Sequence, residues 1–380
     1  MDKRKHSSRH GQSGDPRRRD AEAAAEPDFQ ATPELQQEIE SALASKHPIH
    51  ILMLASSLVA GLETGVATEP SELPSPAEFV RMFLAGDDRL QLLAWAAAQL
   101  LPDQRLRVEV RNNLAPDALP AWLAAVEHAE IVAAWQTTDP LQDGSDVVVS
   151  LRLGEADLSV VGLVDLDSRG ALKDGFAIPD PLPTFQQAFL GSDEAGMQSR
   201  DLAPADARAW LSGAIEEGRT WVPPFTSDSW PHARPLMEWA IGRCPSGGEG
   251  WHPQIRNRDE IEAVVGEFAQ TEAGRQIIGR PEEHAVLVDA LHVLAQETFA
   301  DPLLLSAVRL QMGLSYLWAT RLHEDADAVL ALPDLLVPFV RYAHSRRGIP
   351  AADTDQALAA IAHCRAGYVA DVAAANDLDD

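Results

Sequence analysis

The residue types best suited to chemistry follow an apolar segment that ends at Val164, near the middle of the chain. They are Asp165, Asp167, Arg169, Lys173 and Asp174. At the two-residue period of a β-strand, Asp165 and Asp167 lie on one face. Two carboxylates on one face can act as a nucleophile and an acid or base, or they can bind Mg²⁺. We therefore take these five residues as the candidate binding residues.

The chemical interpretations of the two aspartates differ in what else they require. Haloacid-dehalogenase-like phosphatases also place two aspartates two residues apart after a buried strand, but they need further parallel strands. Beyond residue 180 the chain has helical patterns instead. A Mg²⁺ site needs a third ligand or substrate phosphates. A nuclease motif needs an acidic residue two positions before Lys173, where Ala171 stands. We predict no catalytic residue, and a Mg²⁺-dependent or metal-free hydrolase or phosphotransferase using Asp165 and Asp167 remains the alternative function.

A tight turn accounts for the same residues without any chemistry. Asp and Ser side chains bond their own backbone in turns, and glycine adopts positive φ without strain. Asp167, Ser168 and Gly170 provide these residue types in a suitable order. We therefore predict that this stretch is first of all a turn between two strands, and the place where a polar site would lie if one exists.

Metal and cofactor motifs are missing from the sequence. His284 and His292 are eight residues apart on one predicted helix, about 12 Å, which is too far to bind one ion. His323 and Glu324 are neighbours, and neighbouring side chains do not face each other on a helix. No paired Cys/His spacing, phosphate loop or dinucleotide-binding motif occurs. The sequence predicts no metal site and no cofactor.

The charge of the chain argues against nucleic acid as the main partner. The net charge is -27, although residues 1–20 hold seven Lys or Arg against three Asp, which leaves -31 on the rest. An acidic body repels phosphate backbones, so only the basic tail could touch nucleic acid. We predict a disordered basic tail over residues 1–30. A regulatory factor whose tail contacts nucleic acid is the third functional option.

The hydrophobic pattern predicts a mainly α fold, with a multi-helix body and a small antiparallel three-stranded β-meander inserted near the middle (α+β). Residues 31–140 form an N-terminal helical region in which we expect a helix over 117–136. Between residues 106 and 110 apolar and charged residues alternate, but the flanking pattern favours a helix. The division predicted downstream is a β-meander at 141–185 and a C-terminal helical region at 186–380. These regions pack as one or two globular units.

The prediction of the meander depends on a change in the hydrophobic period from 3.6 to 2 residues, which begins at residue 146. The expected strands are 146–153, 158–166 and 171–178. The middle strand is apolar on both faces, as in a strand covered on both sides. After residue 185 the helical period returns.

Residues 219–256 form a loop rich in tryptophan and proline. Aromatic side chains dominate binding hot spots, so Trp221, Trp230 and Trp251 are candidate contacts with a partner. A long loop is also often held on its own domain by such side chains. The composition favours this packing interpretation over the recognition interpretation.

Three segments resemble a family of mainly helical actinobacterial proteins that has no assigned activity. They are "ALASKHPIHILMLASSLVAGLE", "VVGLVDLDSRGALKDGF" and "LPDLLVPFVRYAHSRRGIPAADTDQALAAI". The family pattern places Asp-His-Asn before a glycine turn and then Lys-Asp. Lys173 and Asp174 fit that pattern, whereas Leu166 stands at the histidine position. The resemblance implies a helical fold and no catalytic role.

These observations favour a non-enzymatic, cytoplasmic helical protein that acts by protein–protein interaction. The longest apolar run, Ile49–Leu62, contains His50, Ser56 and Ser57 and is too short to cross a bilayer. No apolar signal segment follows the basic tail. The two cysteines are far apart, as expected in a reducing compartment. We expect a protein partner and no membrane partner.

Overall fold

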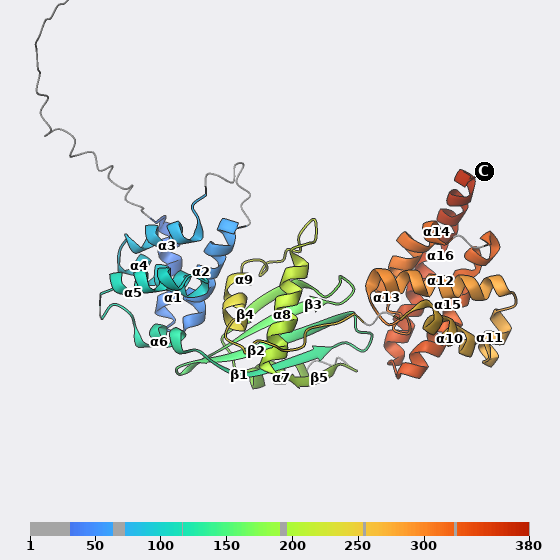
Figure 1. Ribbon diagram of the computed structural model, residues 1–380, viewed down its shortest axis with the longest axis horizontal. Coiled ribbons are helices and arrows are strands. Elements are labelled where there is room, and N and C mark those ends of the chain that lie inside the picture. The colour runs from blue at the N-terminus through green and yellow to red at the C-terminus, as the bar shows by residue number, and fades with distance from the viewer. Residues whose placement is uncertain are drawn as a thin grey trace, which may run out of the picture.

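The computed structural model describes residues 31–63, 73–115, 117–190, 196–253, 256–322 and 325–379. Within them, a group of helices, an antiparallel sheet with its covering helices, and a second group of helices follow one another along the longest axis (Figure 1). The predicted disordered tail, residues 1–30, lies outside the described residues.

Most helices of the first group begin directly after an N-capping residue. Its members are α1 (Pro33–Ala44), α2 (Pro48–Glu63), α3 (Pro76–Leu84), α4 (Asp88–Leu100) and α5 (Gln104–Asn113). At the start of α3, Ser75 and Glu78 form a capping box, in which each side chain bonds the other residue's backbone. Helix α5 covers residues 106–110, which confirms the helix expected there.

The sheet is entirely antiparallel, in the order β4-β3-β2-β1-β5. Its strands are β1 (Glu130–Thr138), β2 (Gly144–Leu153), β3 (Ala156–Asp165), β4 (Ala171–Ile178) and β5 (Gln198–Leu202). The three expected strands are present as β2, β3 and β4. The prediction of a three-stranded meander is wrong, because β1 and β5 extend the sheet to five strands.

The predicted helix over 117–136 is wrong over most of its length. Only α6 (Ala121–Ala124) and the short 3₁₀-helix η1 (Ala125–His128) are helical, and β1 follows. The β-formers of β1, Trp135 among them, outweigh a helix propensity that comes mainly from alanine. Strand β5 is short and polar, and it exists because its backbone pairs with β1.

Helices cover both faces of the sheet. On one face lie α8 (Pro204–Gly218) and α9 (Arg234–Ile241), and α8 runs across the strands in Figure 1. Gly162 of β3 permits this packing, since a Cβ there would lie 2.4 Å from a methyl of Leu211. On the other face, α7 (Leu182–Leu190) contributes to a small cluster around Trp135.

The C-terminal helices enclose a separate hydrophobic core. They are α10 (Arg258–Ala269), α11 (Glu272–Ile277), α12 (Pro281–Thr298), α13 (Ala307–Met312), the π-helix η2 (Gly313–Leu317), α14 (Trp318–Arg321), α15 (Ala326–Arg347) and α16 (Ala351–Asp379). Trp318 lies at the centre, and its Nε1 donates to the carbonyl of Ala290 at 2.9 Å. Phe268 and Phe339 pack edge to face with centroids 5.3 Å apart.

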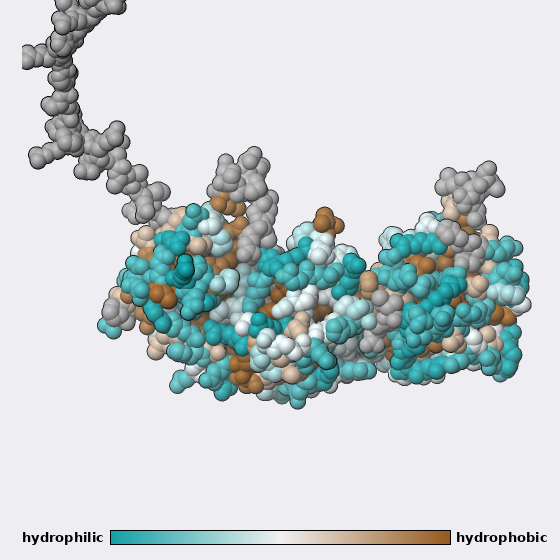
Figure 2. All heavy atoms as spheres, in the orientation of Figure 1, coloured by the Kyte–Doolittle hydropathy of each residue, from teal (hydrophilic) through white to brown (hydrophobic). Residues whose placement is uncertain are grey.

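The large hydrophobic clusters show which helices belong together. One cluster runs from Ala31 to Cys244 and the other from Ile261 to Val372. Helices α8 and α9 therefore pack with the sheet, although the sequence-based division groups them with the C-terminal helices. No helix among the described residues is long and apolar enough to cross a membrane. On the face shown in Figure 2, hydrophilic residues dominate and the hydrophobic patches are small and separate.

Candidate functional site

A buried arginine, Arg309 of α13, joins the C-terminal helices to the sheet. Its side chain is 1% exposed, and its Nε donates to Oδ1 of Asp167 at 2.7 Å. Its Nη2 lies 3.3 Å from Oδ1 of Asp143. The remaining hydrogen bonds go to the carbonyl oxygens of Leu141, Gln142 and Leu304. One side chain thus holds the β1–β2 turn and the β3–β4 turn against α13.

Burial changes the acidity of both carboxyl groups in this junction. Loss of solvation raises the pKa of Asp143 to about 6 and that of Asp167 to about 7. The positive charge of Arg309 opposes this rise in both groups, while Asp165 raises the pKa of both and Asp143 raises that of Asp167. The junction therefore takes up protons near neutral pH.

The other candidate residues of the turn have separate partners. Asp165 accepts a hydrogen bond from the backbone N–H of Ser168 at 3.0 Å and lies 3.4 Å from Nζ of Lys173. Arg169 stacks over the ring of Phe299, 5.0 Å from its centroid. Asp174 accepts from the hydroxyls of Ser227 and Ser229 at 2.5 and 2.8 Å.

The stretch is a turn, as expected, but Asp165 and not Asp167 closes it. Gly170 adopts a φ of +74° in this turn. Asp167 points instead to Arg309, so the two acids do not act on one common group. All strand pairings of the described sheet are antiparallel, unlike the parallel strands of haloacid-dehalogenase-like phosphatases.

A groove of about 350 Å³ lies beside this junction, between the strand ends and α13. We call it the acidic groove. Its polar wall carries Asp143, Asp146, Asp165, Asp167 and Lys173. Its apolar wall includes Val308 and Met312. The fold therefore brings Asp165, Asp167 and Lys173 together, although Arg309 already occupies Asp167.

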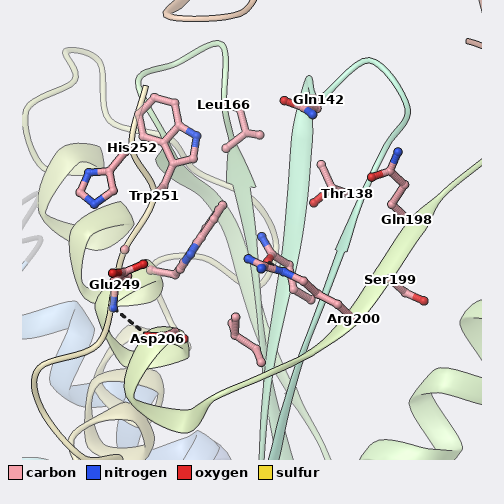
Figure 3. A pocket seen from close by; sticks show the side chains of 14 residues that line it. Thr138, Gln142, Leu166, Gln198, Ser199, Arg200, Asp206, Glu249, Trp251 and His252 are labelled. Atoms are coloured by element: carbon pink, nitrogen blue, oxygen red, sulfur yellow. Dashed lines mark hydrogen bonds between the residues drawn. The ribbon is translucent and has the colours of Figure 1, made fainter. Parts of the chain in front are cut away.

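A second cavity, the polar pocket, has a volume of about 550 Å³ and is shown in Figure 3. It lies between β1, β5, the first turn of α8 and residues 249–252. Its lining combines amides, hydroxyls, carboxylates, two indoles, an imidazole and one guanidinium. Its lining side chains include Gln136, Arg200, Asp206, Trp210, Glu249 and Trp251.

One wall of the polar pocket holds Arg200 in place through a buried amide. Arg200 Nε donates to Oε1 of Gln136 at 2.8 Å, and Gln136 Nε2 donates to Ser145 Oγ at 2.8 Å. Gln136 is only 3% exposed. Among the described residues no carboxylate lies within ion-pair distance of Arg200. Its guanidinium is thus oriented without being neutralised.

The opposite wall carries the acids, as Figure 3 shows for Asp206 and Glu249. Asp206 Oδ1 accepts a hydrogen bond from the backbone N–H of Glu249 at 2.7 Å. Gly248 makes this approach possible, because a Cβ there would lie 2.1 Å from the backbone of Ala205. These contacts fix the loop against the start of α8.

Trp251 connects the pocket to the β3–β4 turn. A Cβ on Gly170 would lie 2.6 Å from its indole ring, so glycine at this turn also makes room for the tryptophan. Trp230 is buried in the first core, and the Nε1 of Trp221 is buried without a hydrogen-bond partner. Of the three candidate tryptophans, only Trp251 lines one of the cavities described above.

The sequence did not predict four residues of the polar pocket, namely Gln136, Arg200, Asp206 and Glu249. Gln136 falls at the end of a predicted helix, and Arg200 lies in a strand too short and polar to show a period. The one signal present was the run of β-formers in residues 131–138. The glycines on either side of Glu249 indicate that the backbone there comes close to another segment, but the sequence does not show which segment.

The described residues offer no metal site. No group of three or more His, Cys, Asp or Glu side chains among them is arranged to hold an ion. His323 and Glu324 lie outside the described residues. Within the polar pocket, Ser199 and His252 share no hydrogen bond, so the pocket shows no nucleophile–base pair there.

The chain matches no known protein family, and no curated protein or solved structure shows significant similarity to it. Leu166 lines the polar pocket.

Replacing Arg309 tests the junction. Arg309→Met leaves the buried carboxylate of Asp167 and the partly buried one of Asp143 without their cation, and we expect a loss of about 3–5 kcal/mol in the free energy of unfolding. Urea unfolding provides the measurement. The control Arg346→Met removes an exposed pair with Glu267 and should cost at most about 1 kcal/mol. Equal losses of unfolding free energy in the two variants would show that the junction stabilises the fold no more than an exposed ion pair does.

The pH dependence of stability follows from the raised pKa values of Asp143 and Asp167. A carboxyl whose pKa is higher in the folded state stabilises the fold below its unfolded value, and this contribution is lost as the pH rises through about 6 and 7. We expect the melting temperature to fall from pH 5 to pH 8, and to fall less in Asp167→Asn. Asp88→Asn, which alters an exposed carboxylate on α4, serves as the control. An unchanged slope in Asp167→Asn would contradict the assignment.

Proposed function

We propose that the chain is a non-enzymatic binding protein whose polar pocket holds a small zwitterion of the amino-acid class. The observation that supports this is the separation of charge across the pocket. Arg200 is held by the buried Gln136 on one wall, and Asp206 and Glu249 stand on the other.

The two walls complement the two ends of an amino acid. A guanidinium binds a carboxylate through charge-assisted hydrogen bonds, and carboxylates bind an ammonium group in the same way. A simple anion would meet Asp206 and Glu249, and a simple cation would meet Arg200, so each is disfavoured. Trp210 and Trp251 offer aromatic surface for the ligand's side chain. The cavity volume of about 550 Å³ is within the usual range for small-molecule sites.

Calorimetry with three matched compounds tests the proposal. We expect phenylalanine, as a representative zwitterion, to bind more tightly than phenethylamine or 3-phenylpropionate, each of which lacks one charge. Arg200→Met should weaken binding of the zwitterion about tenfold or more, since it removes a charge-assisted pair. Arg152→Met on β2, which breaks an exposed pair with Asp157, should leave binding unchanged.

The full set of natural amino acids is then screened by the same method. If none binds at millimolar concentration, or if an amine or carboxylate alone binds as well as the zwitterion, the proposal is wrong.

Contact with a protein partner is a second proposal, and exposed apolar side chains beside the acidic groove favour it. Val308 is 54% exposed and Tyr316 is 78% exposed. Together with Met312 they recur every fourth residue along α13 and η2, which aligns them along one side of the helix. The groove beside them is rich in carboxylates. A basic segment with apolar side chains complements both features.

Selection from a displayed peptide library tests this second proposal. We expect enriched peptides to combine Lys or Arg with large apolar residues and to bind less tightly as salt increases. Val308→Ser should weaken their binding, whereas Val132→Ser, which alters an equally exposed valine on β1, should not. Acidic enriched peptides would contradict it. Tighter peptide binding after deletion of residues 1–20 would identify the chain's own basic tail as the occupant and overturn the partner proposal.

A further inference from the structure

A third cavity, which we call the basic pocket, gathers cations in this acidic chain. It has a volume of about 730 Å³ and lies between the α4–α5 connection, η1 and α9. Arg107 and Arg111 of α5 line it, together with Arg243, which follows α9. It shares no lining residue with the polar pocket or the acidic groove.

The positive charges in the basic pocket are only partly neutralised. Two carboxylates line the pocket and are already paired, Glu127 with Arg111 and Glu238 with Arg219 at 2.7 Å. Among the described residues, Arg107 and Arg243 have no carboxylate partner. Two guanidinium groups therefore face the cavity region with their charge uncompensated.

Backbone carbonyls hold these two guanidinium groups in place. Arg107 Nη1 donates to the carbonyl of Leu101 at 2.9 Å, and Arg243 Nη2 donates to that of Val126 at 3.1 Å. The Arg243 guanidinium also stacks on the ring of Trp239, 4.5 Å from its centroid. These contacts orient both cations before any ligand arrives, which favours tight binding.

Two buried donors in the wall of the basic pocket have no acceptor. The Nε of Arg243 and the Nε1 of Trp239 are buried without a hydrogen-bond partner. Trp239 is only 8% exposed. A buried donor left without an acceptor costs free energy. Burial and the nearby charge of Arg107 also lower the pKa of Arg243, so an anion here would relieve repulsion between like charges.

We propose that the basic pocket binds a phosphate monoester. Two uncompensated cations match a doubly charged group, and several donors match its oxygen atoms. The cavity has room for an organic group beside the phosphate, and Leu100 and Val108 provide an apolar wall for it. This site is independent of the zwitterion proposed for the polar pocket.

Phenyl phosphate binding to the full chain, measured by phosphorus NMR and calorimetry at constant ionic strength, tests the proposal. We expect Arg107→Gln to weaken binding about tenfold to a hundredfold, through loss of a charge-assisted hydrogen bond. Arg107→Lys, which keeps the charge, should lose less. Arg105→Gln, which removes an exposed cation from the same helix, should change nothing.

A second variant blocks the pocket without changing its charge. Val108 is exposed and lines the cavity, so Val108→Trp should fill its entrance and reduce binding while the melting temperature stays near that of the wild type. Arg200→Met should leave phenyl phosphate binding intact, which separates this site from the polar pocket.

Three results would overturn the proposal. They are no binding of phenyl phosphate at millimolar concentration, equal weakening by Arg105→Gln, and tighter binding of the dicarboxylate phthalate than of phenyl phosphate. The last result would show that the pocket selects carboxylates.

Discussion

The buried contact of Arg309 with Asp167 and Asp143 is the interaction on which the arrangement of the chain depends. Placing Arg309 and Asp167 out of water is costly unless the geometry is good and the remaining donors are satisfied. Here three carbonyl oxygens satisfy them. The result is a specific junction between two hydrophobic cores that share no residue. The ion pair explains why these cores meet at this position, since the contact requires the turns and α13 in one relative orientation.

The position of the β3–β4 turn also affects the shape of the polar pocket, because the turn contacts Trp251. With Asp167 held by Arg309, Gly170 faces Trp251, and the Trp251 segment is in turn held on α8 through Glu249 and Asp206. The walls of the pocket therefore come from segments far apart in the chain. Close approach of neighbouring atoms requires glycine at positions 170 and 248, and Gly170 also adopts a positive φ.

Most cations among the described residues form ion pairs, and three that form none lie at the candidate ligand sites. Arg200 is oriented by an amide, and Arg107 and Arg243 are oriented by carbonyl oxygens. Neutral partners fix a guanidinium without cancelling its charge. In a chain with a net charge of -27, such cations are well suited to an anionic group of a ligand.

The local pattern of the sequence predicted many of the helices and strands, but few of the contacts that form the sites. The two-residue period predicted β2, β3 and β4, and the helical period predicted α5, because both signals depend on near neighbours in the chain. Strands β1 and β5 were missed because pairing with another strand outweighs weak local preference. The sequence also located the polar turn at residues 165–174. Only the tertiary structure decided what that turn does, since Arg309 lies 142 residues beyond Asp167. Charge pairing and cavity walls depend on such distant contacts, and no periodicity along the chain records them.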